Sequence, residues 1–430
     1  MQPDKSFQNI SVEALSTKTS DIFHKVPVFS SANGCWLLDS SGNRFFDATG
    51  GSGAINLGHQ HPKVVEAGII QLQKLIHTGC KLQSDVRVEL VNKLRHFLPY
   101  EQYAVLFTVT GAEAIEAALK VARAYTGRKS IIAFERSYHG KTTGALMATW
   151  RQQIKAYSVF PSNAVMRSPY PLLHLPDLNI NSEFCLQALK QTIKQAFDSG
   201  NPPAAILIEP IQITEGVLPA GLEFLKGVIA IAKEAECLVV FDEIYTGFGR
   251  CGLPFYCSQQ EIIPDLLVIG KALGNGFPIS TTIGKPSIIN ALPAGVQTST
   301  FSGHSLACAV SNTVLDVMLE TKPWEQAALL GKQIMQLLTI LAEQNHIISF
   351  PRGEGLAIGF DCLDIKGKLS PELTRAFTAL ALEKGLVLYS GGFENCTIKL
   401  TPPLLMVEEE ISFLLDILSQ IISELKLAFG

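Results

Sequence analysis

The amino-acid sequence predicts an α/β fold with a mostly parallel central sheet, and three observations lead to this fold class. Short continuous apolar runs bounded by turn residues recur along the chain, as at 237–241 and 265–269, and such runs are typical of buried parallel strands. A hydrophobic content of 47% is ample for a large core. A charged residue follows each of the two runs, Asp242 and Lys271, at the strand edge where open α/β sheets bind their ligands.

Length, charge and cysteine usage exclude several classes of protein. The chain has 430 residues and a formal net charge of -4, so it lacks the basic character expected of a nucleic-acid-binding protein. Its nine cysteines include no C-x-x-C pair, which suggests neither a zinc site nor a disulfide framework and indicates a reducing, cytoplasmic location. No targeting signal is recognised at the amino terminus, and no uncharged apolar run reaches membrane-spanning length. We therefore expect neither a nucleic-acid nor a membrane partner.

Residues 1–60 are predicted to form an arm with short strands. The segment 34–51 has the pattern of a β-hairpin, with two apolar runs separated by Ser-Ser-Gly-Asn. His59 and His61 form an isolated H-x-H pair, for which we expect a structural role and no metal. Pro62 is expected to begin a helix, because proline is tolerated at the first helical position. Apolar residues then follow at the spacing of one helix face: Val65, Ile69, Leu72 and Ile76.

Residues 104–128 predict a strand, a tight turn and a helix. The apolar run 104–110 leads into Gly111 and Ala112, and the helix that follows carries Ile115, Ala118, Leu119 and Ala122 on one face. A small-residue turn that opens a helix leaves backbone N–H groups free to bind an anion. We therefore predict a phosphate-binding turn, although glycine-containing turns before helices are common.

Residues 130–149 contain a partial match to a different function. Gly140-Lys141-Thr142 resembles the end of a P-loop, and 239–243 resembles the acidic strand of a nucleotide-binding ATPase. The P-loop pattern needs glycine at position 135, where this chain has Glu135, so the ATPase stays a distant alternative. Tyr138 and His139 follow the predicted strand and are aromatic rings able to stack on a flat cofactor. Ordinary packing is the alternative for both.

The rest of the chain predicts a long loop, further strands and a smaller carboxyl-terminal lobe. Segment 161–178 is rich in proline and serine and predicts a loop. Segment 204–212 is expected to be a strand ending near Glu209 and Gln212, and 222–236 a helix. From about residue 315 the pattern changes to helices and short strands. The last of these helices, 411–429, is interrupted by polar residues and is expected to be amphipathic and packed.

Asp242 and Lys271 together predict a particular chemistry. A lysine among apolar residues loses its charge readily, and a neutral lysine can form a Schiff base with a carbonyl. Pyridoxal phosphate needs such a lysine, together with an Asp or Arg partner for its pyridine nitrogen. Taken singly, a lysine after a strand is usually a surface residue and an aspartate there usually caps a helix.

Several motifs in order along the chain resemble the class III (ω-amino acid) aminotransferases, which are fold-type-I pyridoxal phosphate enzymes. The motifs are TGAEAIEAALKVAR, YHGKTTGALMAT, IEPIQ, VVFDEIYTGFGRCG, GKALGNGFPIS and STFSGHSLACA, and the resemblance spans nearly the whole chain. It implies a large domain with a mostly parallel central sheet flanked by helices, plus a smaller α+β domain. The expected boundaries are 1–60 for an arm that contributes to the small domain, 61–315 for the large domain and 316–430 for the small domain.

The resemblance also implies roles for individual residues. Lys271 would carry the Schiff base and move the proton, while Asp242 would pair with the pyridine nitrogen of pyridoxal 5'-phosphate. Glu209 would lie behind the residues that contact the cofactor and would not contact it directly. Thr300 would reach the phosphate of the neighbouring subunit, which implies a homodimer, or a tetramer, with shared active sites. The cofactor-binding residues implied are Gly111, Ala112, Tyr138, His139, Gln212, Asp242, Ile244, Lys271 and Thr300.

The motifs expected to bind substrate depart from the family pattern. Lys399 stands where many members have an arginine that binds a substrate carboxylate, and Thr214 stands where they have the glutamate that pairs with this arginine. Tyr245 replaces the usual glutamine, and His304-Ser305 replaces Asn-Pro. We expect an aminotransferase that takes an amino group from an amine or ω-amino acid and gives it to 2-oxoglutarate or pyruvate, with Lys399 near the substrate. A racemase, epimerase or aminomutase on the same scaffold is the nearer alternative.

Overall fold

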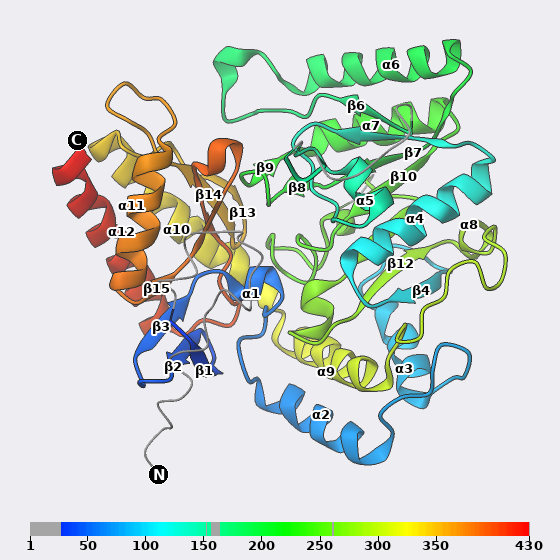
Figure 1. The fold of residues 1–430 in the computed structure, drawn as a ribbon, viewed down its shortest axis with the longest axis horizontal. Helices are drawn as coiled ribbons and strands as arrows, with labels where there is room; N and C mark the ends of the chain where they lie inside the picture. The colour runs from blue at the N-terminus through cyan, green and yellow to red at the C-terminus, as the bar shows by residue number, and fades with distance from the viewer. Residues whose placement is uncertain (1–26, 152, 156–163, 260–261, 430) are drawn as a thin grey trace.

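The computed structural model describes residues 27–151, 153–155, 164–259 and 262–429 (Figure 1). Within these residues, seven strands form the central sheet. In spatial order they are β4 (Ala104–Thr108), β12 (Ser280–Gly284), β11 (Leu266–Ile269), β10 (Leu238–Asp242), β7 (Pro203–Ile208), β5 (Ser130–Phe134) and β6 (Val165–Ser168). Only β12 runs antiparallel to its neighbours. The prediction of an α/β fold with a mostly parallel central sheet is confirmed.

Alternate residues of the central strands enter two different apolar clusters. Val240 and Val268 pack with α4 (Gly111–Thr126), whereas Phe241 and Ile269 belong to the cluster on the other face of the sheet. Because both faces are covered, β10 is apolar up to Asp242 and β11 is apolar at every position. The helices around the sheet are α2 (Pro62–Lys74), α3 (Asp85–Leu94), α4, α5 (Thr143–Ala148), α6 (Ser182–Asp198), α7 (Leu222–Glu234), α8 (Pro286–Ile289) and α9 (Ser305–Thr321) (Figure 1).

A second group of elements lies beside the large sheet (Figure 1). An antiparallel sheet has the order β13 (Arg352–Glu354), β14 (Ala357–Asp361), β17 (Thr397–Leu400) and β16 (Tyr389–Gly391). Three long helices accompany it: α10 (Pro323–Asn345), α11 (Pro371–Glu383) and α12 (Glu408–Phe429). The helix predicted at 411–429 is α12, and its apolar face is buried, as at Leu414 and Leu418.

The amino-terminal strands pair with a strand from the far end of the chain. β1 (Phe29–Asn33), β2 (Trp36–Asp39) and β3 (Arg44–Asp47) form an antiparallel set, and β15 (Leu386–Val387) runs parallel to β3. The predicted hairpin at 34–51 is confirmed by the pairing of β2 with β3. The short elements are α1 (Gly50–Gly53), β8 (Ile211–Gln212), β9 (Leu218–Pro219), and the 3-10 turns η3 (Gln153–Lys155), η4 (Pro176–Leu178), η5 (Tyr256–Ser258), η6 (Lys271–Gly274) and η7 (Phe393–Asn395).

Two local expectations differ from the structure. The segment 161–178, predicted as a loop, contains β6, which pairs with β5 at the edge of the sheet; residues 161–163 lie outside the described part. A four-residue edge strand between prolines and serines carries too little periodicity to be recognised. The second difference is the apolar face of α2. The helix forms as predicted, but Ile69 and Leu72 are 52% and 50% exposed, and the side facing the protein carries Val64, Gly68 and Gln71.

Across the described residues, no helix combines the length and the apolar character needed to cross a membrane.

Candidate active site

Asp242 and Lys271 lie at the same edge of the central sheet because their strands are parallel neighbours. β10 ends at Asp242, which is in register with Val268 of β11, and Lys271 begins the turn η6 directly after β11 and Gly270. The sequence-based expectation that one acid and one amine meet at the carboxyl ends of these strands therefore agrees with the geometry.

The backbone around Lys271 is closely constrained. A Cβ atom at Gly270 would lie 2.5 Å from the Oγ of Ser280, so only glycine fits directly before the lysine. Lys271 itself has a φ of 41°, a left-handed conformation that is uncommon for a residue with a side chain. Backbone strain of this kind collects where the surrounding structure holds a side chain in a required position.

The ammonium of Lys271 has two contacts that the sequence did not indicate. Its Nζ donates a 2.9 Å hydrogen bond to the carbonyl of Ser52 in the turn α1, and lies 3.3 Å from the centre of the Tyr245 ring. Burial and then the positive charge of Lys399 lower the pKa of Lys271 to about 7, against the opposing effect of Asp242 and Glu209. Near neutral pH a large fraction of this amine is uncharged and able to act as a nucleophile or base.

Asp242 is held by a histidine rather than left free at the strand end. Its Oδ2 is 2.7 Å from Nδ1 of His139, and its Oδ1 accepts the backbone N–H of Ile244 at 3.2 Å. The backbone N–H of His139 donates to Oγ1 of Thr149, and both side chains of the Asp-His pair are buried. The His139 ring is therefore occupied by the Asp242 carboxylate. Of the two aromatic residues expected to stack on a flat cofactor, Tyr138 is the one that remains available.

The amino terminus of α4 presents two free backbone donors. Thr110 caps the helix: its Oγ1 accepts the N–H of Glu113, whose carboxylate in turn accepts the N–H of Thr110. The N–H groups of Gly111 and Ala112 make no hydrogen bond within the described residues. Together with the helix dipole they offer a seat for an anion, which is the role expected from the turn sequence.

Ile244 joins this anion seat to Asp242. A Cβ atom at Gly111 would lie 2.7 Å from Cδ1 of Ile244, so the isoleucine side chain lies directly against the glycine. Ile244 follows Asp242 by two residues. The apolar side chain of Ile244 thus lies between the free N–H groups of Gly111 and Ala112 and the Asp242 carboxylate.

Glu209 directly follows β7, and Gln212 is the last residue of β8. Gln212 is buried and donates from Nε2 to the carbonyl of Glu135 at 2.8 Å, whereas its Oε1 has no partner. Glu209 accepts the backbone N–H of Tyr138 at 2.8 Å. Burial raises the pKa of Glu209 well above its usual range, and the negative charge of Asp242 adds to this effect.

These features fit a pyridoxal phosphate group. Oε1 of Gln212, a buried polar atom of this site, lacks a hydrogen-bond partner within the described residues. Buried polar groups are normally paired, so such an atom points to a site that is completed by another group. The helix end at Gly111 and Ala112 suits a phosphate, the Asp242 carboxylate suits a pyridinium, and the Lys271 amine suits an aldehyde.

Lys399 lies in β17 with two charged neighbours. Its side chain folds over Gly391 of the adjacent strand, where a Cβ atom would be 2.9 Å from Nζ. Burial and then the charge of Arg151 lower the pKa of Lys399 to about 8, against the opposing effect of Glu215. Thr214 provides no carboxylate here, but Glu215, the next residue, is buried and forms an ion pair with Arg151. The sequence did not indicate this pair.

Thr300 stands apart from the other predicted residues. It is exposed, in a turn before α9, and the structure gives its side chain no hydrogen bond. The nearby His304 ring stacks on that of His77 with centroids 4.9 Å apart. His59, predicted to be structural, has Nε2 2.8 Å from Oδ2 of Asp47.

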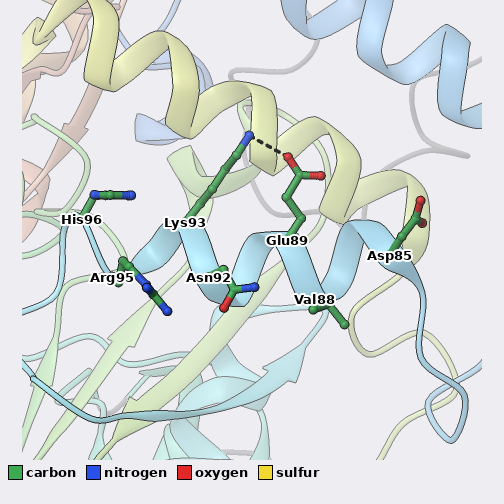
Figure 2. Close-up of a pocket in the computed structure, with 7 residues that line it drawn as sticks. All are labelled: Asp85, Val88, Glu89, Asn92, Lys93, Arg95 and His96. Carbon is green, nitrogen blue, oxygen red and sulfur yellow. Dashed lines mark ion pairs between the residues drawn. The ribbon is translucent and has the colours of Figure 1, made fainter.

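The surface also has a hollow along α3, which is not part of this site. Figure 2 shows that its lining comes from α3 and from the two residues that follow it, Arg95 and His96, and that Lys93 forms an ion pair with Glu89 there. None of the residues at the carboxyl ends of β10 and β11 lines it. We therefore assign it no role in the chemistry.

The chain is similar to known proteins over nearly its whole length. A family model described as aminotransferase class-III matches residues 19–422. An acetylornithine aminotransferase of Bacillus anthracis is 32% identical over 385 residues, covering 89% of this chain and 91% of that protein. An ornithine aminotransferase of Bacillus cereus is 33% identical over 424 residues, covering 96% and 98%. The solved structure of an amine transaminase from an uncultivated Pseudomonas species, in its pyridoxal-phosphate-bound form, matches with a TM-score of 0.87 and 25% identity over 95% of this chain and 97% of that one.

Proposed function

We propose that Lys271 and Asp242 are the catalytic residues of this protein. The chain belongs to the class III aminotransferase family and is a pyridoxal-phosphate-dependent aminotransferase. This assignment rests on the position of Asp242 and Lys271 at the carboxyl ends of the neighbouring strands β10 and β11. It also rests on the pKa of the Lys271 amine, which its surroundings, burial above all, lower to about 7. Family membership supports transamination and gives no support to a racemase, an aminomutase or an ATPase.

Pyridoxal phosphate, when bound, supplies an aldehyde and a protonated pyridine ring that withdraws electrons from the reacting carbon. The Lys271 amine would hold the aldehyde as a Schiff base. Once the donor amine has displaced it from the aldehyde, its Nζ, uncharged in a large fraction of molecules near neutral pH, would remove the proton from Cα of the donor and deliver it to the former aldehyde carbon. To do so the amine leaves the Ser52 carbonyl, its hydrogen-bond partner in this structure.

Asp242 and His139 would act as one unit beneath the pyridine nitrogen. The buried Asp242 carboxylate supplies the negative charge that favours a protonated ring nitrogen, and His139 orients this carboxylate through the 2.7 Å contact with Oδ2. Of the two residues, Asp242 would be the one that contacts the cofactor. His139 acts through it as a positioning residue.

The remaining residues proposed to contact the cofactor lie between Asp242 and the amino terminus of α4 or next to them. Gly111 and Ala112 would bind the phosphate by their free N–H groups, and Ile244 would pack under the ring. Tyr138 would cover the ring from the other side. Oε1 of Gln212, which is buried without a partner, would accept a hydrogen bond from the ring hydroxyl.

We also propose a homodimer, or a tetramer built from dimers, in which Thr300 completes the phosphate site of the neighbouring subunit. The exposed Thr300 turn and the exposed apolar face of α2 support this assembly. Ile69 and Leu72 leave half of their surface in water, and such apolar patches are typical of protein interfaces. Sedimentation of the purified enzyme tests the proposal, and an active monomer would refute it.

The expected division of the chain and its location are also proposed here. The pairing of β3 with β15 supports joining the arm 1–60 to the small domain at 316–430, with the large domain at 61–315. None of the nine cysteines forms a disulfide, which is consistent with a cytoplasmic enzyme.

The donor is proposed to be an amine or ω-amino acid, and the acceptor 2-oxoglutarate or pyruvate. Relatives named ornithine and acetylornithine aminotransferase support a donor with an amino group at the end of a chain. A donor screen with both keto acids, followed by mass spectrometry, tests the function. Amino-group transfer that requires a keto acid at every turnover supports it, and turnover that continues without any keto acid contradicts it.

A further inference from the structure

Two contacts hold the ring of Tyr245 against the reacting lysine. The hydroxyl of Tyr245 lies 3.2 Å from Oγ1 of Thr401, which directly follows β17. The edge of the ring lies against Gly53, where a Cβ atom would be 2.7 Å from Cδ1 of the tyrosine. The centre of the ring is 3.3 Å from Nζ of Lys271. Tyr245 is also a position at which the chain departs from the family pattern, so the sequence singles it out without giving it a role.

The hydroxyl of Tyr245 is the donor in its hydrogen bond with Thr401. A threonine hydroxyl has one proton, and Thr401 donates this proton to the carbonyl of Thr49 at 2.9 Å. Thr401 therefore accepts from the tyrosine. Because burial raises the pKa of the Tyr245 hydroxyl, the side chain is a neutral phenol near neutral pH. It offers the amine of Lys271 the electron-rich face of an uncharged aromatic ring.

The second group that contacts the amine is the backbone carbonyl of Ser52, and its turn is held in a strained conformation. Ser52 has a φ of 63°, in the left-handed region that residues with a side chain rarely adopt. The carboxylate of Asp47 fixes the turn by accepting the backbone N–H groups of Thr49 and Gly51 at 2.9 and 3.1 Å. Lys271 is left-handed as well, so the 2.9 Å hydrogen bond joins two strained residues from distant segments.

The aromatic ring and the carbonyl both favour the charged form of the amine. A ring face attracts a cation, and an ammonium donates a stronger hydrogen bond than a neutral amine does. The charged groups around the amine have mixed effects. Burial lowers the pKa of Lys271 most, and the charges of Lys399 and Arg250 also lower it. Asp242 and Glu209 raise it, so the two uncharged contacts act in the same direction as these carboxylates.

We propose that Tyr245 is a positioning residue of the reaction, whose ring face forms, with the carbonyl of Ser52, a site for the ammonium of Lys271. This pair of groups is called the ammonium site below. The inference rests on the proposed function and adds a residue to it.

The ammonium site acts when the amine is not bonded to the cofactor. The amine takes a proton from Cα of the donor, and the electron pair of the broken C–H bond stays behind on the donor. The amine thereby becomes an ammonium, and the ring of Tyr245 and the Ser52 carbonyl stabilise its charge until the proton is given up. Tyr245 thus acts through Lys271 and touches neither substrate nor cofactor.

Competitive labelling of the lysines with acetic anhydride in the cofactor-free enzyme tests the ammonium site without turnover. Tyr245→Leu removes the ring and keeps an apolar side chain. It should lower the pH midpoint for labelling of Lys271 by about one unit, which corresponds to a tenfold loss of preference for the ammonium. Tyr245→Phe keeps the ring face and loses only the hydroxyl, so this matched control should keep the wild-type midpoint. A midpoint that stays in place or rises in Tyr245→Leu would overturn the proposal.

A second measurement separates this role from a merely structural one. At about pH 8.5 the Lys271 amine is neutral in nearly all molecules, so the rate of Cα proton removal reports how well its ammonium is stabilised. In single turnovers Tyr245→Leu should slow this step about threefold to tenfold and leave the donor Kd within twofold, while Tyr245→Phe should retain most of the rate. A Tyr245→Phe enzyme as slow as Tyr245→Leu would refute a role for the ring.

The two measurements also keep this inference apart from the proposed function. If Tyr245→Leu does not fold, Tyr245→Gln takes its place, since it also lacks a ring, and an unmoved midpoint in that variant overturns the inference. Normal transamination with an unmoved midpoint would remove the ammonium site alone. A lowered midpoint in an enzyme that transaminates nothing would refute the proposed function and leave the contact between Tyr245 and the ammonium standing.

Discussion

The lowered pKa of Lys271 makes a prediction that can be measured without cofactor or substrate. In the structure, burial and the charge of Lys399 lower this pKa from 10.5 to about 7, and Asp242 and Glu209 oppose the shift. Each unit of pKa corresponds to about 1.4 kcal/mol, so the environment disfavours the charged amine by about 5 kcal/mol. At pH 7 about half of the Lys271 amines are neutral, compared with about 1 in 3,000 for an ordinary lysine.

Competitive labelling with acetic anhydride reports the neutral fraction of each lysine. In the cofactor-free enzyme, labelling of Lys271, followed by mass spectrometry, should rise through pH 7 and reach a plateau by about pH 8. Between pH 8 and pH 9 a free lysine amide should still gain about tenfold in rate, because its pKa is about 10.4. Slow access of the reagent to the half-buried amine lowers the plateau and leaves the midpoint where it is.

Two substitutions should move this midpoint in opposite directions. Lys399→Met removes a positive charge and should raise the pKa of Lys271, whereas Asp242→Asn removes a negative charge and should lower it. Lys399→Arg keeps the charge and is the matched control, with no shift expected. The reasoning is refuted if the wild-type labelling rate of Lys271 still rises about tenfold between pH 8 and pH 9, or if Lys399→Met and Asp242→Asn move the midpoint the same way.

Three further predictions follow from the site. Asp242→Asn should retain cofactor and slow removal of the donor Cα proton by several orders of magnitude in stopped-flow measurements; a near-normal rate would remove Asp242 from its role. Gly111→Val should raise the cofactor Kd at least tenfold in absorbance titrations, because its first side-chain carbon would lie 2.7 Å from Ile244 Cδ1, and unchanged affinity would argue against the anion seat. An inactive bulky Thr300 variant mixed with Lys271→Ala under subunit exchange should regain activity, since each hybrid dimer then has one intact site; no recovery, with exchange verified, would contradict the shared site.

Most of the sheet could be predicted from the sequence because its strands are apolar on both faces. The runs around β7, β10 and β11 contain no competing pattern, and the chemistry-bearing residues follow them directly. β6 was missed because its four residues at the sheet edge lie among prolines and serines. The face of α2 illustrates a different limit. Its apolar spacing identifies the helix correctly, but periodicity does not say whether the apolar face meets the core or a second protein surface.

The residues proposed to bind the cofactor could be selected from the sequence, whereas the contacts between distant segments could not. Gly111, Asp242 and Lys271 each stand at a turn whose position follows from the strand before it. The pair of Arg151 and Glu215 joins residues 64 positions apart, and neither residue lies in a motif that predicts the other. The contact of Lys271 with the Ser52 carbonyl likewise depends on how the amino-terminal turn folds back onto the sheet. Only the three-dimensional structure brings such groups together.

The central claim is that Lys271 is the lysine that holds pyridoxal phosphate. Reduction of the holoenzyme with borohydride converts a Schiff base into a stable secondary amine, and peptide mapping by mass spectrometry then locates the pyridoxyl group. We predict a single labelled peptide carrying the group on Lys271, and no label in the Lys271→Ala variant. A pyridoxyl group on any other lysine of the wild-type enzyme would contradict the assignment.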